Sequence, residues 1–220
     1  MGTPEANRPF GSPGAREGVL GETSEFLFKV TTAFLAVPYA GIHGYFLFSR
    51  PKGKKVRRVN RGRNYFSYAL LLFSWIPLLL YLLSPAIDHW RMPIPLALRW
   101  LGALLLAAGN SLFYWSHKAL GKNWSPFLEI QEGQEFITHG PYRWSRHPIY
   151  GSLFLIHIGV ALLTANGMVA GVFLVSICLL YLLRVPWEEK MMLEQFGEAY
   201  KRYMNQTGRL FPHWRRRDHG

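Results

Sequence analysis

The sequence predicts an all-α integral membrane protein with about five transmembrane helices and an amphipathic C-terminal helix. Half of the 220 residues are hydrophobic, although the chain carries a formal net charge of +12. The charged residues are segregated from the apolar runs, and five of these runs approach the roughly 20 residues that a helix needs to cross a bilayer. A soluble domain of this size could not cover so much apolar surface.

Five apolar segments are the candidate membrane spans. They comprise residues 26–48, 65–84, 95–115, 149–165 and 168–183. In the third segment, Gly102 and Gly109 would allow a neighbouring helix to approach closely. The last two segments are short and meet at Asn166 and Gly167, so we expect an antiparallel hairpin with a tight turn. A re-entrant hairpin that does not cross fully is the alternative.

The remaining segments complete the domain organisation. Residues 1–24 are rich in Gly, Pro and Glu without periodicity, and we expect a disordered tail there. Residues 25–213 would form one membrane domain, and residues 214–220 a basic C-terminal tail. Beyond Pro186, where we expect the chain to restart, aromatic and apolar residues recur at helical spacing. Residues 187–204 should therefore form an amphipathic helix that lies on the membrane or folds back over the helix ends.

The distribution of lysine and arginine predicts the orientation in the membrane. Residues 50–63 contain eight basic and no acidic residues, which places this connection in the cytoplasm. Alternation then puts the N-terminus outside, and residues 116–148 and the chain after Arg184 inside. The same segregation argues against nucleic-acid binding, because such a face interleaves basic residues with polar and aromatic ones. Membrane lipids are the expected surroundings.

A dense polar cluster, residues 140–151, precedes the fourth span. Pro148 suits the first turn of a helix, so Arg146 and His147 lie just before a helix N-terminus, where free N–H groups can meet an anion. Arginine and tyrosine side chains that anchor the helix in lipid headgroups would give the same composition. This cluster alone leaves a ligand site and a lipid anchor open.

A second polar cluster follows the last span. Arg184 and Glu188 are one helical turn apart, and an ordinary ion pair would explain them. Glu188 and Glu189 are adjacent carboxylates at the inner end of a membrane helix. They favour a site for a cationic ligand, because a carboxylate stabilises a cation most in a low-dielectric pocket. The sulfonium and ammonium groups of S-adenosylmethionine suit such a site.

The histidines allow a different interpretation. His43 and His157 fall in separate spans and could together ligate a haem, although neutral histidines hydrogen-bonded within the bundle are the simpler explanation. His117, His139 and His147 lack the paired spacing of a metal motif, so no metal site is predicted. A non-enzymatic membrane anchor that binds haem or quinone is therefore the alternative from a different functional class.

In this order, the two clusters resemble the C-terminal signature of the isoprenylcysteine carboxyl methyltransferase family and the related phospholipid N-methyltransferases. The resemblance covers about residues 117–213. The first half of the signature is met by Gly140, Tyr142, Arg146, His147, Pro148 and Tyr150. The second half is met by Arg184, Glu188, Glu189, Leu193, Phe196, Gly197, Tyr200 and Tyr203, with Arg209 and Pro212 downstream.

The resemblance implies a methyltransferase that uses S-adenosylmethionine, with its active site at the cytoplasmic face. The cofactor-binding residues that it implies are Gly140, Tyr142, Arg146, His147, Pro148, Tyr150, Glu188 and Glu189, the two glutamates facing the charged end of the cofactor. The implied catalytic candidates are Arg184, Arg209 and Tyr203. Either arginine could hold an acceptor carboxylate or orient the site.

The implied acceptor is a lipophilic small molecule or a prenylated one that reaches the site laterally through the bilayer. An isoprenylcysteine-type carboxylate is the first expectation, and it needs no base because it is ionised at neutral pH. A phospholipid amine or a small thiol is the alternative. Such an acceptor must lose a proton, which His147 or Tyr203 could accept.

Overall fold

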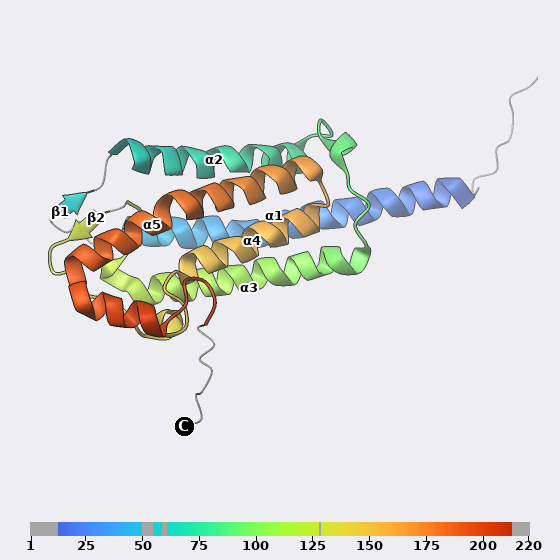
Figure 1. Ribbon diagram of the computed structural model, residues 1–220. Helices are drawn as coiled ribbons and strands as arrows, with labels where there is room; N and C mark the ends of the chain where they lie inside the picture. Colours follow the sequence, from blue (N-terminus) through green and yellow to red (C-terminus); the bar gives the residue numbers. More distant parts are fainter. Residues whose placement is uncertain (1–12, 50–54, 59–60, 128, 213–220) are drawn as a thin grey trace, which may run out of the picture.

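The computed structural model describes residues 13–49, 55–58, 61–127 and 129–212. Within these ranges, five α-helices lie side by side in an elongated bundle (Figure 1). They are α1 (Pro13–Ser49), α2 (Arg61–Leu83), α3 (Leu96–Leu120), α4 (Pro148–Thr164) and α5 (Gly167–Gln206). The predicted all-α membrane fold is confirmed. The expected tail 214–220 and parts of the basic segment 50–63 lie outside the described residues.

Four segments within or overlapping these helices are long and apolar enough to cross a membrane. They are Thr23–Ser49, Tyr65–Leu83, Leu96–Asn123 and Gly167–Gln206. α4 is a shorter apolar helix of 17 residues. At 1.5 Å per residue it is about 26 Å long, a little less than the hydrocarbon core of a bilayer. The predicted shortness of this segment is confirmed.

α4 and α5 form the predicted antiparallel hairpin. Its turn contains Ala165, which has a positive φ of 47°, and Asn166. The Asn166 side chain accepts hydrogen bonds from the N–H groups of Met168 and Val169 at 3.1 and 3.2 Å, and so caps α5. Its amide group donates to the Ile87 carbonyl at 2.7 Å, which ties the turn to the connection between α2 and α3.

Glycines bring α3 and α4 into close contact. A Cβ atom added to Gly159 would lie 2.7 Å from the backbone nitrogen of Leu106. One added to Gly102 would lie 2.7 Å from the Gly159 oxygen, and one at Gly109 would lie 2.7 Å from the Ile156 side chain. Small residues therefore permit backbone approach at this interface, as predicted for Gly102 and Gly109.

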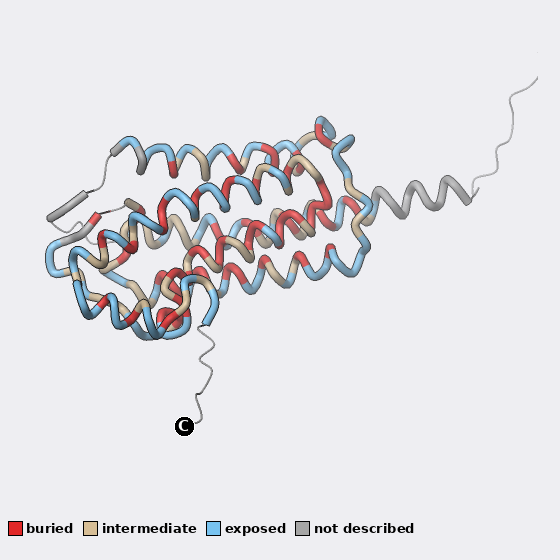
Figure 2. The backbone as a smooth tube through the Cα atoms, in the orientation of Figure 1, coloured by how far each residue is buried: buried red, intermediate tan, exposed pale blue. Residues whose placement is uncertain are grey.

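Buried and exposed residues are distributed as expected for a helix bundle in lipid. Figure 2 shows buried positions concentrated along α4, whereas much of α2 is exposed. Val160 and Leu163 of α4 are completely buried. Leu72 and Phe73 of α2 are 71% and 63% exposed, a degree of apolar exposure that suits contact with acyl chains rather than water.

The start of α1 differs from the sequence prediction. Residues 13–24 belong to α1, so the expectation that residues 1–24 are disordered is wrong for this part. Once an apolar span is helical, extending it is inexpensive, because each added residue gains a backbone hydrogen bond. Residues 1–12 lie outside the described part of the chain.

The end of α5 also differs from the prediction. The helix continues through Pro186, where a restart was expected, and is broken instead at Gly197, with φ 51° and ψ −128°. Proline removes one helical hydrogen bond, whereas glycine can adopt a backbone conformation that turns the chain. The last part of α5 folds back along the end of the bundle (Figure 1), which is one of the two arrangements predicted for residues 187–204.

A small antiparallel sheet, which the sequence did not indicate, lies at one end of the bundle (Figure 1). It pairs β1 (Lys55–Arg58) with β2 (Glu129–Gln131). Two 3₁₀ helices, η2 (Gly121–Asn123) and η3 (Gly140–Arg143), lie in the connection from α3 to α4. A third, η1 (Asp88–Trp90), follows α2 at the opposite end.

The segments predicted to be cytoplasmic gather at the end that carries the sheet (Figure 1). They are the connection from α3 to α4 and the last turns of α5. The α4–α5 turn lies at the opposite end, where Arg91 and Asn166 form an isolated β-bridge. The alternation of spans is thus consistent with the predicted common side, and the assignment of that side to the cytoplasm stays a prediction.

An ion cluster joins four helices at the end opposite the sheet. Glu25 of α1 lies 2.9 Å from the Arg99 guanidinium of α3 and accepts a hydrogen bond from the Tyr81 hydroxyl of α2 at 2.6 Å. Arg99 also donates to the Leu163 carbonyl of α4 at 3.0 Å. Glu25 and Arg99 are both buried, so their charges depend on these contacts.

Candidate functional site

A cavity lies at the end of the bundle that carries the sheet, and every helix contributes to its wall. Tyr39 comes from α1, Tyr68 from α2, Phe113 from α3, Tyr150 from α4 and Leu180 from α5. The cavity has a volume of about 230 Å³ and opens to solvent. Pockets for small molecules span roughly 300–1,000 Å³, so this cavity lies close to the lower limit for one small-molecule site.

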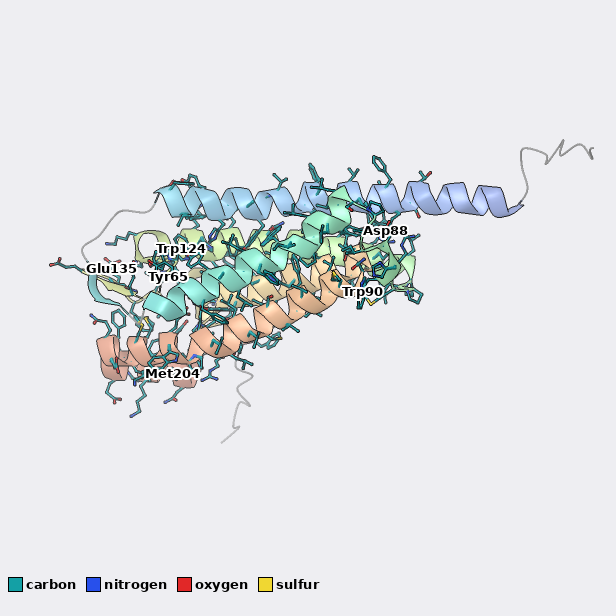
Figure 3. The ribbon with its side chains drawn as sticks, turned by 90° about the horizontal axis from the view of Figure 1, so that it is seen from above. Tyr65, Asp88, Trp90, Trp124, Glu135 and Met204 are labelled. Carbon is teal, nitrogen blue, oxygen red and sulfur yellow. The ribbon has the colours of Figure 1, made fainter. Side chains whose placement is uncertain are left out.

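Figure 3 labels residues at both ends of the molecule. Trp124 and Glu135, which line the cavity, lie at the same end as Met204 on the folded-back part of α5. Asp88 and Trp90 lie at the other end. The cavity is therefore remote from the buried Glu25–Arg99 ion pair.

Seven of the eleven candidate site residues line this cavity. They are Tyr142, Arg146, His147, Tyr150, Arg184, Glu188 and Tyr203. The other four, Gly140, Pro148, Glu189 and Arg209, are not among the described residues that line it. Gly140 begins η3 with a φ of 61°, and Pro148 begins α4. These two shape the segment that carries the lining residues.

Glu189 is held by positively charged side chains and is nearly inaccessible. Arg146 Nε lies 3.0 Å from one carboxylate oxygen, and Arg209 Nη2 lies 2.7 Å from the other. His147 Nε2 is 3.3 Å from the same carboxylate. The Glu189 carboxylate raises the pKa of Arg209. Because these contacts use the carboxylate, the described geometry gives Glu189 a role in joining segments of the site.

Backbone hydrogen bonds hold the chain just after α5 against residues 145–147. The N–H of Arg146 donates to the Gly208 carbonyl at 2.9 Å, and that of His147 donates to the Arg209 carbonyl at 3.0 Å. The Ser145 hydroxyl donates to the same Arg209 carbonyl at 2.7 Å. The Arg146 guanidinium also donates to the Thr207 carbonyl. The chain after α5 thus supports the segment that precedes α4.

Glu188 is more accessible than Glu189 and faces the cavity. It accepts a hydrogen bond from the Tyr150 hydroxyl at 2.6 Å and lies 3.4 Å from Arg184 Nη2. His147 Nδ1 is 3.6 Å away. The Glu188 side chain is 26% exposed, against 5% for Glu189. The two adjacent carboxylates, which the sequence could not distinguish, therefore have different surroundings.

Arg184 closes another part of the wall. Its two Nη atoms donate to the Pro126 carbonyl at 3.3 and 3.2 Å, and its Nε is buried with no hydrogen-bond partner among the described residues. The predicted ion pair with Glu188 is present, but long. Arg184 thus joins α5 to the connection that follows η2.

Tyr203 and Tyr142 connect the folded-back part of α5 with η3. The Tyr203 hydroxyl donates to the Tyr142 carbonyl at 2.5 Å. Burial raises the pKa of Tyr142 well above its ordinary value, so its phenol stays neutral. Because Tyr203 already donates its proton to a backbone carbonyl, its geometry favours a structural contact over uptake of a proton.

A group of cavity residues was missing from the predicted site. His43 and Tyr39 of α1, Phe113 and His117 of α3, and Trp124 after η2 line the cavity. The signal in the sequence was the position of His43 within an apolar span. The histidine that was paired with it in the haem hypothesis, His157, is not among the lining residues and contacts Phe173 of α5 at a ring distance of 5.0 Å.

Comparisons with known proteins show which proteins this chain is similar to. Residues 97–199 match the family model of the phospholipid methyltransferases. The protein-S-isoprenylcysteine O-methyltransferase of Tribolium castaneum is 27% identical over 126 residues, which are 56% of this chain and 42% of that protein. The enzyme of the same name from Saccharomyces cerevisiae is 29% identical over 110 residues, 49% of this chain and 46% of that protein. The chain thus spans about half the length of these curated relatives.

A bacterial relative and a solved structure extend the comparison. The uncharacterized protein YpbQ of Bacillus subtilis is 24% identical over 169 residues, which are 76% of this chain and 98% of that protein. The structure of the eukaryotic intramembrane Ras methyltransferase ICMT has a TM-score of 0.51, with 24% identity over 70% of this chain and 54% of that chain. It shares the fold. The predicted resemblance to the isoprenylcysteine carboxyl methyltransferase family is confirmed.

Proposed function

From its resemblance to the isoprenylcysteine carboxyl methyltransferase family, we propose that this chain transfers a methyl group from S-adenosylmethionine to a lipophilic acceptor. One observation carries the proposal. The cavity brings the polar side chains of both signature halves, one running from η3 to the start of α4 and the other on α5, together with apolar side chains of α1, α2 and α3. One cavity therefore offers polar groups for a charged cofactor beside apolar groups for an acceptor.

The chemistry of the lining residues fits the cofactor. When bound, S-adenosylmethionine supplies an electrophilic methyl group on a sulfonium. Glu188 faces the cavity as a carboxylate, and the aromatic ring of Tyr150 lies in the same wall. Both groups attract a cation, the first by charge and the second by the negative face of its ring. Glu188 is thus the expected partner of the charged end of the cofactor.

Glu189, Arg146 and Arg209 would act indirectly. Their mutual contacts hold residues 145–147 against residues 207–209, and this keeps His147 and Tyr150 in the cavity wall. Fixed walls reduce the freedom of the bound reactants, and such positioning supplies much of the acceleration of a displacement reaction. Exclusion of water adds to it.

The acceptor would enter from the membrane. Tyr39, Leu71 and Phe113 line the cavity from three helices that contain candidate spans, so an apolar tail can extend along them. The names of the curated relatives make an isoprenylcysteine-type carboxylate the first acceptor to test. A phospholipid amine, as the name of the family model suggests, or a small thiol is the alternative.

We expect the cavity to face the cytoplasm, with the N-terminus outside and the C-terminus inside. The cavity lies beside β1, which belongs to the basic segment 50–63. Basic connections are retained on the cytoplasmic side. Cysteine labelling from either side of sealed vesicles would test this orientation.

Calorimetric titration of S-adenosylmethionine into the full chain in detergent tests the cofactor. The parent should bind, and Glu188→Gln should bind at least tenfold more weakly, because it removes the carboxylate and keeps the shape of the side chain. Glu198→Gln is a matched control, since Glu198 lies on the same helix, is itself exposed and pairs with the exposed Lys201. A folded parent that does not bind S-adenosylmethionine would contradict the proposal.

Transfer of a radiolabelled methyl group tests the reaction. N-acetyl-S-farnesylcysteine presents a prenyl tail and a carboxylate, and its labelling by the parent would support the first acceptor class. A preparation with the absorbance of bound haem, or one that binds a quinone and no S-adenosylmethionine, would instead support the membrane-anchor hypothesis.

A further inference from the structure

Two histidines and two aromatic rings form one wall of the cavity. His117 lies 4.2 Å from the Phe113 ring and 4.8 Å from the Trp124 ring, measured between centroids. His43 contacts the same two rings at 6.3 and 5.9 Å. All four residues line the cavity. Two imidazoles from α1 and α3 are thus placed around one region of the space.

The backbone fixes which nitrogen His117 offers. Its Nδ1 lies 2.9 Å from the Phe113 carbonyl oxygen. A carbonyl only accepts, so Nδ1 carries the hydrogen, and the lone pair of the neutral ring is on Nε2. No described residue makes a hydrogen bond to Nε2. The side chain is only 1% exposed, so this basic nitrogen is held in place within an enclosed wall.

His43 supplies a second nitrogen of the same kind. Its Nδ1 is buried and has no hydrogen-bond partner among the described residues. Leaving a buried polar atom unpaired costs free energy, which a bound group that forms the missing hydrogen bond would recover. His43 also lies outside residues 97–199, the part of the chain that matches the family model. It therefore belongs to a part of the wall that can differ between relatives.

Other candidates for proton uptake are already engaged. His147 has one nitrogen 3.6 Å from Glu188 and the other 3.3 Å from Glu189. Tyr203 donates to the Tyr142 carbonyl. His117 is thus better placed than either of them to accept a proton from a molecule in the cavity.

We propose that His117 accepts the proton of the acceptor's nucleophile and that His43 positions the same group, so that the acceptor is a thiol or an amine. The inference rests on the proposed function and narrows its acceptor. An S–H or N–H group can donate to Nε2 of His117, whereas a carboxylate brings a lone pair against a lone pair. The first-named acceptor class, the isoprenylcysteine-type carboxylate, is disfavoured on this ground.

The atoms of the step balance. The acceptor's sulfur or nitrogen forms a bond to the methyl carbon while the bond from that carbon to the sulfonium breaks. The electron pair of the broken bond stays on the departing sulfur, which becomes a neutral thioether. The acceptor's proton passes to Nε2 of His117 and leaves later to water. His117 then returns to the neutral form held by the Phe113 carbonyl.

The test compares two histidines with the same backbone contact. His157 Nδ1 lies 2.7 Å from the Leu153 carbonyl four residues earlier, as His117 does with Phe113, and its side chain is 3% exposed. It is not among the described lining residues. His117→Gln and His157→Gln therefore remove equivalent buried imidazoles, only one of which faces the cavity. Both variants keep a neutral polar side chain.

Full-length parent and variants are assayed for methyl transfer to dodecanethiol, dodecylamine and N-acetyl-S-farnesylcysteine, beside calorimetric titration of S-adenosylmethionine. We expect the parent to methylate the thiol or the amine. His117→Gln should lose about 100-fold of this activity, the lower range for general-base catalysis, with unchanged cofactor affinity. His157→Gln should stay within about threefold of the parent. His43→Phe should raise the KM of the acceptor more than it lowers kcat.

An arylthiol with a dodecyl chain separates a base from a structural role. It is much more acidic than an alkylthiol and largely ionised at neutral pH, so its reactive thiolate depends far less on a base. The loss caused by His117→Gln should shrink to less than tenfold with it. An equal loss with both thiols would overturn the assignment of His117. Methylation of the farnesylcysteine carboxylate alone would overturn the acceptor class. Failure of the parent to bind S-adenosylmethionine would overturn the proposed function, and this inference with it.

Discussion

Replacing Glu189 by alanine should destabilise the folded-back end of α5, whereas replacing Glu188 by alanine should mainly weaken binding of S-adenosylmethionine. The side chains of Glu189 and Arg146 are 5% and 9% exposed, so the substitution of Glu189 leaves a buried guanidinium without its carboxylate. Breaking a buried ion pair from one side costs about 3–5 kcal/mol. Arg209 is 51% exposed and adds about 0–1 kcal/mol.

The corresponding cost for Glu188 is smaller. Its side chain is 26% exposed, and its shortest contact is the hydrogen bond from Tyr150. The buried Arg184 would lose only a long ion pair of 3.4 Å and would keep both hydrogen bonds to the Pro126 carbonyl. Loss of a charge-assisted hydrogen bond that water can partly replace costs about 1–2 kcal/mol. Since Glu188 lines the cavity, the same substitution removes a carboxylate from the expected position of the cationic cofactor. The two adjacent residues thus separate stability from binding.

Thermal unfolding in one detergent and titration of S-adenosylmethionine measure the two effects. For a chain of about this size, 1 kcal/mol corresponds to about 2–4 °C in Tm. Glu189→Ala should lower Tm by about 6 °C or more, at least twice the change in Glu188→Ala. Arg209→Ala, which leaves the contact of Glu189 with Arg146, should fall between the parent and Glu189→Ala. A Glu189→Ala variant with the parental Tm and no cofactor binding would refute this reasoning, since it would mean that Glu189 contacts the cofactor.

Three further predictions concern the scaffold. Gly159→Val should lower the free energy of unfolding by at least about 2 kcal/mol in the same thermal melts, because its Cβ would meet backbone atoms of α3. Gly151→Ala is the control: a Cβ there has nothing within 4 Å, so this variant should be neutral or slightly more stable. Gly197→Ala should cost about 1–3 kcal/mol through its positive φ and should increase proteolysis after residue 197; unchanged cleavage would argue against a role in folding back. Arg99→Leu should destabilise the bundle by about 3 kcal/mol, because the buried Glu25 loses its closest cation and keeps only the Tyr81 hydroxyl and the half-exposed Arg91 at 3.6 Å among the described residues. Cofactor affinity measured on the remaining folded protein should stay parental.

Much of the fold could be predicted from local sequence. A backbone in lipid must satisfy its own hydrogen bonds, so long apolar runs become helices whatever their neighbours are. The short connection at Asn166 and Gly167 predicted the hairpin, and Gly102 and Gly109 predicted the close approach of α3 to its neighbour. The start of α1 and the break in α5 at Gly197 were harder to predict. Residues 13–24 lack the apolar periodicity that identified the helix over residues 187–204.

The sequence predicted most of the residues that the candidate site contains, but less about what each residue does there. The two signature clusters were expected to meet, and seven of their residues line one cavity. The sequence could not distinguish Glu188 from Glu189, because both follow the same span. Their difference arises from the position of each on the helix: Glu189 faces Arg146 and Arg209, and Glu188 faces the cavity.

The sequence by itself determined the membrane helices, the hairpin and the two polar clusters, since each depends on residues close together in the chain. Only the tertiary structure decided that the chain after α5 pairs with residues 145–147, and that His43 and His117 share one wall of the cavity. These contacts join segments separated by about 60 residues or more along the chain. They depend on how the helices pack, and the pattern within any one helix does not specify its neighbour.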